Sequence, residues 1–550
     1  MSFPKQLNQN LYKNLIKEGI KKANKQAFTE SEMAFLKAIK LNKKNHLAHI
    51  NLSNVYILQN KIKQAVELLM DYILKYSFNE TISNHTAKVL YLYNYKKDLL
   101  NLFKASDLNS KYNFSKKYYL YFIKGSYYEN EKQYKKTEEA YLRSIESNKY
   151  YFDTYNKLLN LYEQTNEFDK FNKLLKHGFK NFTEHKYLKI LLLYKTLITS
   201  REKNFLISQE IIVKNDLYYK LKNDKIYLSK LLDIETKNNE KLKNYNLAFQ
   251  KAKERNNILL EFKENKKFDG KNIYNSIDKY KIFFKKNNVE SINTNLQYQN
   301  DENLVFLIGF PRSGTTLMDS ILRSHSKISV LEEKPYLLNL RHEFFIKNNN
   351  NLTALLNITQ NIKDKIRKDY FEKIHLNTNN RKKIIIDKFP LTIIELGFIK
   401  CIFPNAKIIL AMRHPCDVVL SCYFSTFKIN DAMINFLSWD NTINFYNKVF
   451  DLYEFYEKEL NLQSLTVKYE DIVENFNIKV SEITNFLGLD YEDNMENFYL
   501  TARKRQKIST PSYSQVINPL YSSSINRWKN FSSSDQAKKQ LNKWIKKFNY

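Results

Sequence analysis

One stretch of the chain, Asn303 to Thr316 (NLVFLIGFPRSGTT), constrains the fold more than any other. Its apolar run Leu304–Ile308 is short and unbroken, which is typical of a buried parallel strand. Gly309 ends this run, and from Thr315 onwards the apolar residues recur at helical spacing. A strand, a loop of small residues and a helix N-terminus together form an anion site, because the N–H groups and the helix dipole face the bound group. The stretch therefore predicts an α/β unit with a phosphate-binding loop.

This loop differs from that of a nucleotide-hydrolysing protein. GFPRSGTT keeps the G-x-x-x-x-G frame of a Walker A motif, but Thr315 stands where that motif has Lys, and the cation is Arg312 within the loop. No residue nearby in the sequence resembles the Mg²⁺-holding Walker B carboxylate. PRSGTT after an apolar strand resembles the 5′-phosphosulfate loop of sulfotransferases, especially the tyrosylprotein sulfotransferase-like branch. The resemblance implies 3′-phosphoadenosine 5′-phosphosulfate (PAPS) as the donor, no metal, and a donor-binding loop made of Pro311, Arg312, Ser313, Gly314, Thr315 and Thr316.

The same resemblance implies catalytic roles for three side chains. Glu332 and Glu333 follow the short apolar stretch Ile328–Leu331, at the distance where the tyrosylprotein branch carries a Glu-Glu pair. The second glutamate, Glu333, is then the expected general base, since a positioned carboxylate can take the proton of an acceptor hydroxyl. Lys388 follows the apolar run KIIID and, with Arg312, is expected to stabilise charge on the leaving group. A loop with two solvated carboxylates and a lysine that only caps a strand are the alternatives.

Two residues further along the chain distinguish the donor from ATP. A third apolar run, AKIILAM, leads into Arg413, and Ser421 follows eight residues later. In PAPS-dependent sulfotransferases an arginine and a serine at this spacing hold the 3′-phosphate, which ATP lacks. An arginine at a strand end and a serine on the first turns of the next helix can face one cleft, and arginine gives forked charge-assisted bonds. The resemblance further implies Tyr469 near the adenine (a core tyrosine is the alternative), Ser512 near the 3′-phosphate and Arg527 at the 5′-phosphate.

Residues 1–265 are predicted to form helical repeats. Gly19 and Ser53 occupy the same small-residue position 34 residues apart, and Gly125 recurs as Leu159 at the same interval. A period of 34 is that of tetratricopeptide (TPR) repeats, whose helix pairs bury their apolar faces only against their neighbours. A generic α-solenoid or bundle is the alternative, and either offers a surface for a protein or peptide. Residues 266–302 then form a linker or docking segment, and 303–550 the sulfotransferase domain.

Composition limits the class of protein. Only 8 Gly and 8 Pro among 550 residues favour long helices over a β-sandwich. The formal net charge is +31, but the lysines are spread along the chain, which indicates anionic ligands rather than dedicated nucleic-acid binding. The three cysteines match no metal or disulfide spacing. The N-terminus lacks the apolar core of a signal peptide and no apolar run reaches about 18 residues, so a cytoplasmic protein without a membrane span is expected.

The sequence therefore predicts two parts, an all-α TPR-like array and an α/β P-loop-type sulfotransferase domain with a mainly parallel sheet. The expected reaction is metal-free transfer of a sulfuryl group from PAPS to an acceptor hydroxyl, and protein tyrosine is one candidate acceptor. Lys334-Pro335 stands where the tyrosylprotein branch has Thr-Arg, so a glycan, a lipid and a small phenol stay open too. A P-loop kinase or NTPase, and a non-catalytic TPR scaffold carrying an inactive sulfotransferase domain, are the alternative functions.

Overall fold

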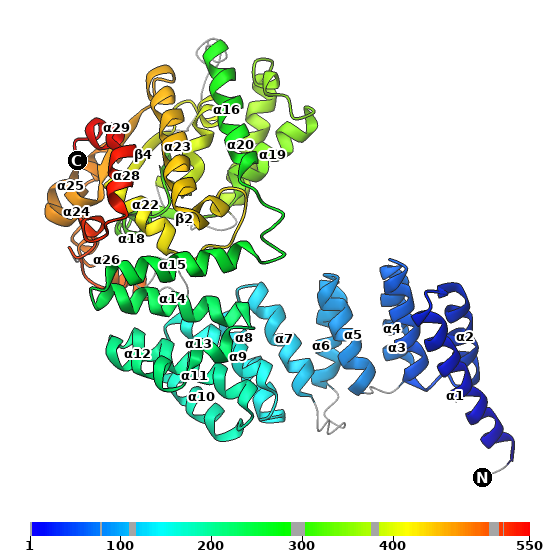
Figure 1. Cartoon of the computed structure of the whole chain (residues 1–550). Helices are drawn as coiled ribbons and strands as arrows, with labels where there is room; N and C mark the ends of the chain where they lie inside the picture. Colours follow the sequence, from blue (N-terminus) through cyan, green and yellow to red (C-terminus); the bar gives the residue numbers. More distant parts are fainter. Residues whose placement is uncertain are drawn as a thin grey trace. The chain divides into compact units, whose positions relative to one another are not determined.

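The computed structural model describes residues 3–76, 80–108, 117–287, 303–375, 384–504, 516–520 and 522–550 (Figure 1). The chain divides into two compact units, Met1–Tyr194 and Lys195–Tyr550, and helix α11 (His185–Arg201) contains the boundary. Within the described ranges the first unit is entirely helical and the second contains the sheet, which confirms the predicted fold class. No helix in these ranges is long and apolar enough to cross a membrane.

The first unit is built from successive helix pairs. In two of the pairs, α1/α2 and α7/α8, the helices approach closely at a glycine: a Cβ added to Gly19 would lie 2.6 Å from the Phe35 ring, and one added to Gly125 would lie 2.4 Å from the Tyr141 ring. In both pairs the ring follows the glycine by sixteen residues, so one packing contact recurs along the array. The helices are α1 (Phe3–Asn24), α2 (Phe28–Leu41), α3 (His46–Leu58), α4 (Ile62–Lys75), α5 (Glu80–Leu92), α6 (Lys96–Leu108), α7 (Tyr118–Asn130), α8 (Tyr134–Ser147), α9 (Phe152–Thr165) and α10 (Phe168–Asn181).

The turns inside these pairs share a backbone conformation. One residue of each turn is left-handed, with φ between 55° and 62°: Gln26, Asn60, Asn94, Lys132 and Asn166. Three of the four intervals between them are 34 residues and the fourth is 38. This regularity is consistent with TPR-like repeats.

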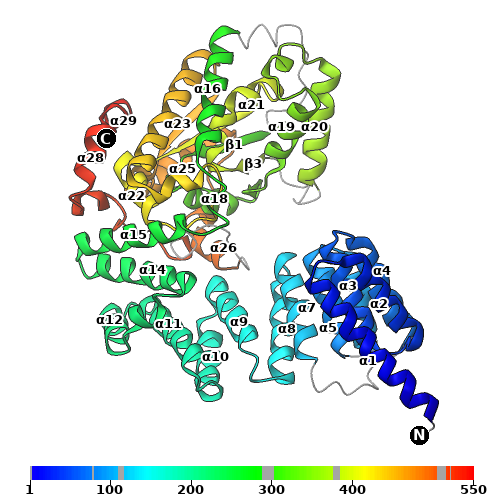
Figure 2. The ribbon, with the colours of Figure 1, turned by 45° about the vertical axis from the view of Figure 1, so that its right-hand side comes forward.

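Five parallel strands form the sheet of the second unit, in the order β2-β3-β1-β4-β5. Val305 and Leu307 of β1 pack into the core on one face, together with α18, α25 and α26. Phe306 and Ile308 pack into the core on the other face, together with α16, α20 and α23. Figure 2 shows β1 and β3 with helices around them. The strands are β1 (Leu304–Gly309), β2 (Ile328–Glu332), β3 (Ile384–Lys388), β4 (Lys407–Met412) and β5 (Ser464–Lys468).

The helices of the second unit after α11 fall into two groups along the chain. Before the sheet come α12 (Phe205–Lys214), α13 (Leu217–Leu221), α14 (Lys225–Lys241), α15 (Tyr245–Leu260) and α16 (Lys271–Lys286). Between and after the strands come α18 (Thr315–Arg323), α19 (Tyr336–Lys347), η1 (Leu352–Leu355), α20 (Gln360–His375), η2 (Pro390–Glu395), α21 (Leu396–Ile402), α22 (Pro415–Phe424), η3 (Met433–Leu437), α23 (Trp439–Glu459), α24 (Tyr469–Glu474), α25 (Phe476–Leu487), η4 (Asp493–Met495), α26 (Phe498–Lys504), η5 (Arg527–Asn530), α28 (Ser534–Gln540) and α29 (Asn542–Lys547).

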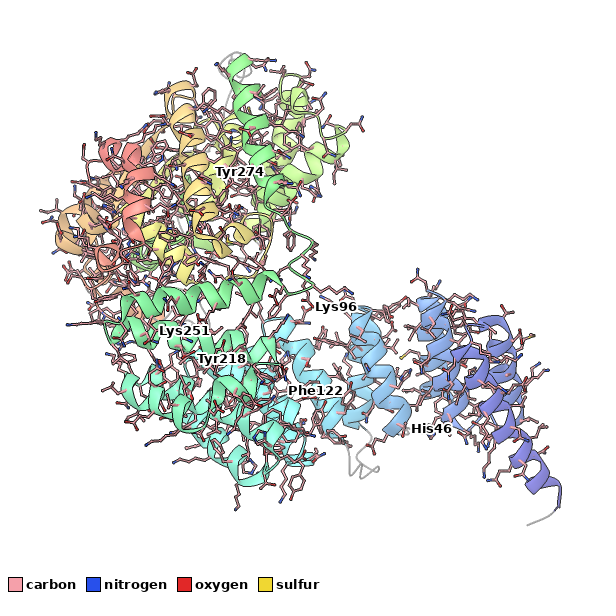
Figure 3. All side chains as sticks on the ribbon, in the orientation of Figure 1. His46, Lys96, Phe122, Tyr218, Lys251 and Tyr274 are labelled. Carbon is pink, nitrogen blue, oxygen red and sulfur yellow. The ribbon has the colours of Figure 1, made fainter. Side chains whose placement is uncertain are left out.

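Helices on both sides of the predicted boundary at residue 265 pack against the α/β part. Arg255 of α15 is 1% exposed and donates hydrogen bonds to the main-chain oxygens of Tyr423 (2.8 Å) and Phe424 (3.0 Å) at the end of α22. Tyr274 of α16, labelled in Figure 3, contacts the Phe445 ring of α23, with 5.8 Å between centroids. Thus α15 and α16 belong to the compact unit that contains the sheet. The predicted division into residues 1–265 and 303–550 as separate domains remains a prediction.

The strand order places a ligand crevice at one point of the sheet. From the central strand β1 the chain continues to β2 and β3 on one side, and later to β4 and β5 on the other. The carboxyl ends of β1 and β4 therefore flank the point where the strand order reverses. Open α/β sheets bind their ligands at this switch point.

Candidate functional site

The loop after β1 leads directly into α18 at the switch point. Gly314 precedes the helix with φ 100°, a conformation that favours glycine, and an added Cβ would make a tight contact, 3.2 Å from Cδ2 of Tyr469. Arg312 is also left-handed, with φ 70°, which costs about 1 kcal/mol or more for a residue with a Cβ. The loop thus combines a strained arginine with a helix N-terminus, an arrangement that suits an anion.

Arg312 and Arg413 line one cavity that is open to solvent. Arg312 Nε donates a hydrogen bond to Ser421 Oγ at 2.9 Å. Arg413 is 7% exposed, stacks on the Tyr469 ring at 5.0 Å from its centroid, and donates from Nη2 to the main-chain oxygen of Ser524. Four of the predicted donor-binding residues therefore lie together, and one hydrogen bond joins the two predicted phosphate positions.

The other loop residues divide between the cavity and the interior. Gly314 and Thr316 line the cavity, whereas Ser313 and Thr315 are buried and are absent from its lining. The main-chain oxygen of Pro311 accepts a hydrogen bond from Cys422 Sγ at 3.2 Å. The roles predicted for these residues in donor binding remain predictions.

Five further residues of the cavity wall come from the stretch STPSYSQVINPLYSSSINRW (509–528), which resembles the loop that closes over the donor in sulfotransferases; they are Val516, Asn518, Pro519, Leu520 and Ser524. That this stretch closes over a donor remains a prediction. The other two wall residues, Leu317 and Phe498, were not predicted, because neither belongs to a motif.

At the carboxyl end of β3, Lys388 is fully buried among carboxylates. Its Nζ donates to Glu333 Oε1 at 2.9 Å and lies 3.8 Å from Glu332 Oε1 and 3.9 Å from Asp319 Oδ2. The Glu333 N–H donates to the main-chain oxygen of Lys388 at 2.8 Å, which extends the pairing of β2 with β3, and Glu333 itself is left-handed, with φ 47°. The two predicted catalytic residues Glu333 and Lys388 are therefore in direct contact. Strained backbone at a residue with a side chain is typical of functional sites.

Asp319 was not singled out from the sequence, although a signal was present. It is a charged residue within a helix whose first eight positions are all buried. Its Oδ1 accepts a hydrogen bond from Arg323 Nε at 2.8 Å. A fully buried carboxylate in such a helix requires a cationic partner, and the sequence alone does not identify Lys388 as one.

Asp387 precedes Lys388 and points to the opposite face of the sheet. The Tyr370 hydroxyl donates to Asp387 Oδ2 at 2.6 Å. Burial raises the pKa of Asp387 to about 7, although the Tyr370 bond and the nearby Lys388 ammonium act in the opposite direction. This carboxyl group therefore titrates close to neutral pH.

Two predicted donor-binding residues are not observed in the cavity. Ser512 lies outside the described residues. Arg527 is absent from the lining: its guanidinium pairs with Glu240 of α14, with 2.8 Å between Nη2 and Oε2, and lies 5.1 Å from the Phe424 ring centroid. Their predicted roles at the donor phosphates remain predictions.

The segment around Arg527 is fastened to α22. The Trp528 N–H donates to Asp417 Oδ1 at 2.8 Å, and the Trp528 ring stacks on His414 with 4.9 Å between centroids. Burial and neighbouring cations lower the pKa of His414 to about 4, so the ring is neutral and its Nδ1 accepts from the Cys416 N–H. His414 thus caps α22, the helix that carries Ser421.

Comparison with known proteins supports the predicted resemblance. The model of the sulfotransferase family matches residues 305–493. This part of the chain resembles sulfotransferases. An uncharacterized protein of Aquifex aeolicus is 27% identical over 242 residues, which cover 41% of this chain and 30% of the relative. Protein-tyrosine sulfotransferase A of Caenorhabditis elegans is 24% identical over 249 residues, which cover 43% of this chain and 64% of the relative.

The chain therefore spans less than two thirds of either relative. Among solved structures, the sulfotransferase domain of an olefin synthase from Synechococcus PCC 7002 is similar, with 20% identity and a TM-score of 0.31. That alignment covers 45% of this chain and 97% of the domain.

Proposed function

We propose that this protein is a PAPS-dependent sulfotransferase that moves a sulfuryl group to an acceptor hydroxyl. One observation carries the proposal: Arg312 and Arg413 line a single cavity at the switch point of the sheet, with Ser421 hydrogen-bonded to Arg312. The sulfotransferase family model covers all three residues. No second function has an observation of this kind in its favour.

The residues of the cavity fit the chemistry of PAPS. The donor has an anionic group at each of two positions on the ribose, and the cavity offers two guanidinium groups. Arg312 and the α18 N-terminus suit the 5′ group, and Arg413 with Ser421 suits the 3′-phosphate. The flat adenine suits the aromatic and apolar wall that Tyr469 and Phe498 provide. Bound there, PAPS supplies an activated sulfuryl group.

The charged side chains at the ends of β2 and β3 suit the proton and charge movements of the transfer. Glu333 is 31% exposed, so its carboxylate can be reached by an acceptor and can take the proton of its hydroxyl. Lys388 and Arg312 supply positive charge for the oxygen that leaves the sulfur, and electrostatic stabilisation of this type is usually the largest contribution to such reactions.

The acceptor and the helical array complete the proposal. We propose that the array binds a protein partner or substrate and that the acceptor hydroxyl belongs to a polypeptide, with tyrosine as the first candidate. The support is that relatives 24% identical to this chain over about 250 residues are named protein-tyrosine sulfotransferases. Because Lys334-Pro335 stands where the tyrosylprotein branch has Thr-Arg, hydroxyl groups other than that of tyrosine are also candidate acceptors.

A thermal-shift assay without Mg²⁺ tests the donor. PAPS and its desulfonated product PAP should raise the melting temperature by mass action, and more strongly than adenosine 5′-phosphosulfate, which lacks the 3′-phosphate. In Arg413→Ala the shift with PAPS should fall to that of adenosine 5′-phosphosulfate. Equal shifts with ATP and PAPS in the unmodified chain would contradict the proposal.

A further inference from the structure

The buried Lys388 ammonium is surrounded by carboxylates from two elements. Glu332 and Glu333 come from the end of β2 and the residue after it, whereas Asp319 comes from α18, the helix that starts at the phosphate-binding loop. Asp319 and Lys388 are both 0% exposed. Arg323, one turn further along α18, holds Asp319 Oδ1 at 2.8 Å, and Oδ2 lies 3.9 Å from Lys388 Nζ. The orientation of Asp319 toward Lys388 is thus fixed from within its own helix.

Charge counting separates the roles of the three carboxylates. With ordinary protonation, Asp319, Glu332 and Glu333 carry three negative charges, and Lys388 and Arg323 carry two positive charges. A proton taken up by Glu333 brings the sum to zero. The same proton weakens the shortest contact of Lys388, because a neutral carboxyl group attracts an ammonium far less than a carboxylate does. A fully buried ammonium then requires another anion to hold it in place.

We propose that Asp319 is a positioning residue that holds the Lys388 ammonium at the end of β3 while Glu333 carries the acceptor's proton. This inference rests on the proposed function, since it assigns the proton to Glu333. Glu332 is partly exposed, at 12%, and is the last residue of β2, directly before Glu333. Asp319 is the carboxylate that stands on a separate helix, α18, so its distance from Lys388 does not depend on the segment that carries Glu332 and Glu333.

Asp319→Asn tests the inference by separating rate from affinity. Two quantities are measured on the full chain: the affinity for PAP by calorimetry, and the single-turnover consumption of radiolabelled PAPS with 4-nitrophenol present. PAP affinity should stay the same or increase, because the variant removes a negative charge near an anion site. The single-turnover rate should fall about 10- to 100-fold, the size expected when a catalytic group loses its position. A residue needed only for folding would lower both quantities.

Three variants control this test. Asp319→Glu keeps the charge and should restore most of the rate. Arg323→Gln releases Asp319 Oδ1 without removing the carboxylate and should lower the rate less than Asp319→Asn does. Glu492→Gln removes a carboxylate that accepts from the Ser326 N–H (2.7 Å) just beyond α18, and it should leave the rate unchanged. If Asp319→Asn does not fold, Arg323→Gln still decides the question, because a normal rate in that variant would contradict the inference.

Failure of the inference differs from failure of the proposed function. If the unmodified chain binds PAP and consumes PAPS but Asp319→Asn reacts at the parental rate, Asp319 does not position Lys388. If the unmodified chain neither binds PAP nor consumes PAPS, the proposed function is wrong and the inference is wrong with it.

Discussion

The cavity lined by Arg312 and Arg413 and the cluster around Lys388 (Asp319, Glu332 and Glu333, here called the Lys388 cluster) lie at the same edge of the sheet. They differ in how their charged groups are paired. Two guanidinium groups line the cavity, and Asp417 lies 3.9 Å from that of Arg413. Around Lys388, three carboxylates lie within 4 Å of one ammonium that has no exposure to solvent. A pocket lined by two cations suits the binding of an anion from solution, whereas a cluster that one further proton brings to zero net charge suits the movement of a proton. Binding and chemistry should therefore respond to different substitutions.

The largest expected effect is that of Glu333→Gln. The glutamine keeps an oxygen that can accept the Lys388 hydrogen bond, but it cannot take a proton. The single-turnover rate should drop by about 10² to 10⁴, the usual contribution of a positioned general base, while PAP affinity stays nearly unchanged. Radiolabelled PAPS and calorimetric titration with PAP measure the two quantities.

Glu332→Gln is the matched control, because it removes a neighbouring carboxylate that lies 3.8 Å from Lys388 without touching the proposed base. It should affect the rate much less. If Glu332→Gln has the large effect and Glu333→Gln does not, the proton acceptor is Glu332 and the assignment made here is wrong.

A smaller effect, confined to affinity, is expected for Arg413→Ala. A hydrogen bond to a charged group contributes about 1.5–3 kcal/mol, so PAP affinity should fall about 10- to 100-fold. The rate at saturating PAPS should change little, because Arg413 lies in the cavity and outside the Lys388 cluster. Arg413→Lys keeps the charge but not the forked geometry, so its PAP affinity should lie between that of the parent and that of Arg413→Ala. A loss of rate at saturation as large as that of Glu333→Gln would remove the distinction between the two regions.

The fold was predictable to the extent that it depends on local patterns. The apolar runs at 304–308 and 406–412 appear as β1 and β4, and the small-residue spacing gave a helical array. The turns of that array could not be recognised, because Gln26, Asn60 and Lys132 share a left-handed backbone but no side-chain type. Likewise, nothing local to α15 shows that Arg255 is buried against the carbonyl groups at the end of α22.

Local motifs predicted individual residues of the candidate site, but not the contacts between residues of distant segments. Glu333 and Lys388 were each assigned by resemblance, and the structure adds that they touch, which a sequence does not state. The contact of Arg527 could not be predicted either, because its partner Glu240 lies 287 residues earlier, in a helix that no sulfotransferase motif covers. Contacts of this kind depend on tertiary packing, and so they follow only from the structure.

The smallest expected effect concerns Asp387, which adjoins the Lys388 cluster but points to the other face of the sheet. Burial raises its pKa to about 7 in the folded chain, from the value of 3.8 of an exposed aspartate. Between about pH 4 and 7 the folded chain holds this proton while the unfolded chain has released it. The stability that the proton contributes is therefore fully present below about pH 4 and is lost as pH rises to about 7.

Asp387→Asn removes this pH dependence, because the amide does not titrate but still offers an oxygen to the Tyr370 hydroxyl. The melting temperature of the variant should exceed that of the parent by a few degrees at pH 8, and the difference should shrink as pH falls toward 5. Measuring the difference between the two proteins cancels the titration of histidines and other groups that both contain. Tyr370→Phe, which removes the hydroxyl that bonds Asp387 at 2.6 Å, should lower stability most above pH 7, where Asp387 is charged. A difference between Asp387→Asn and the parent that is constant from pH 5 to 8 would show that Asp387 does not change its charge in this range.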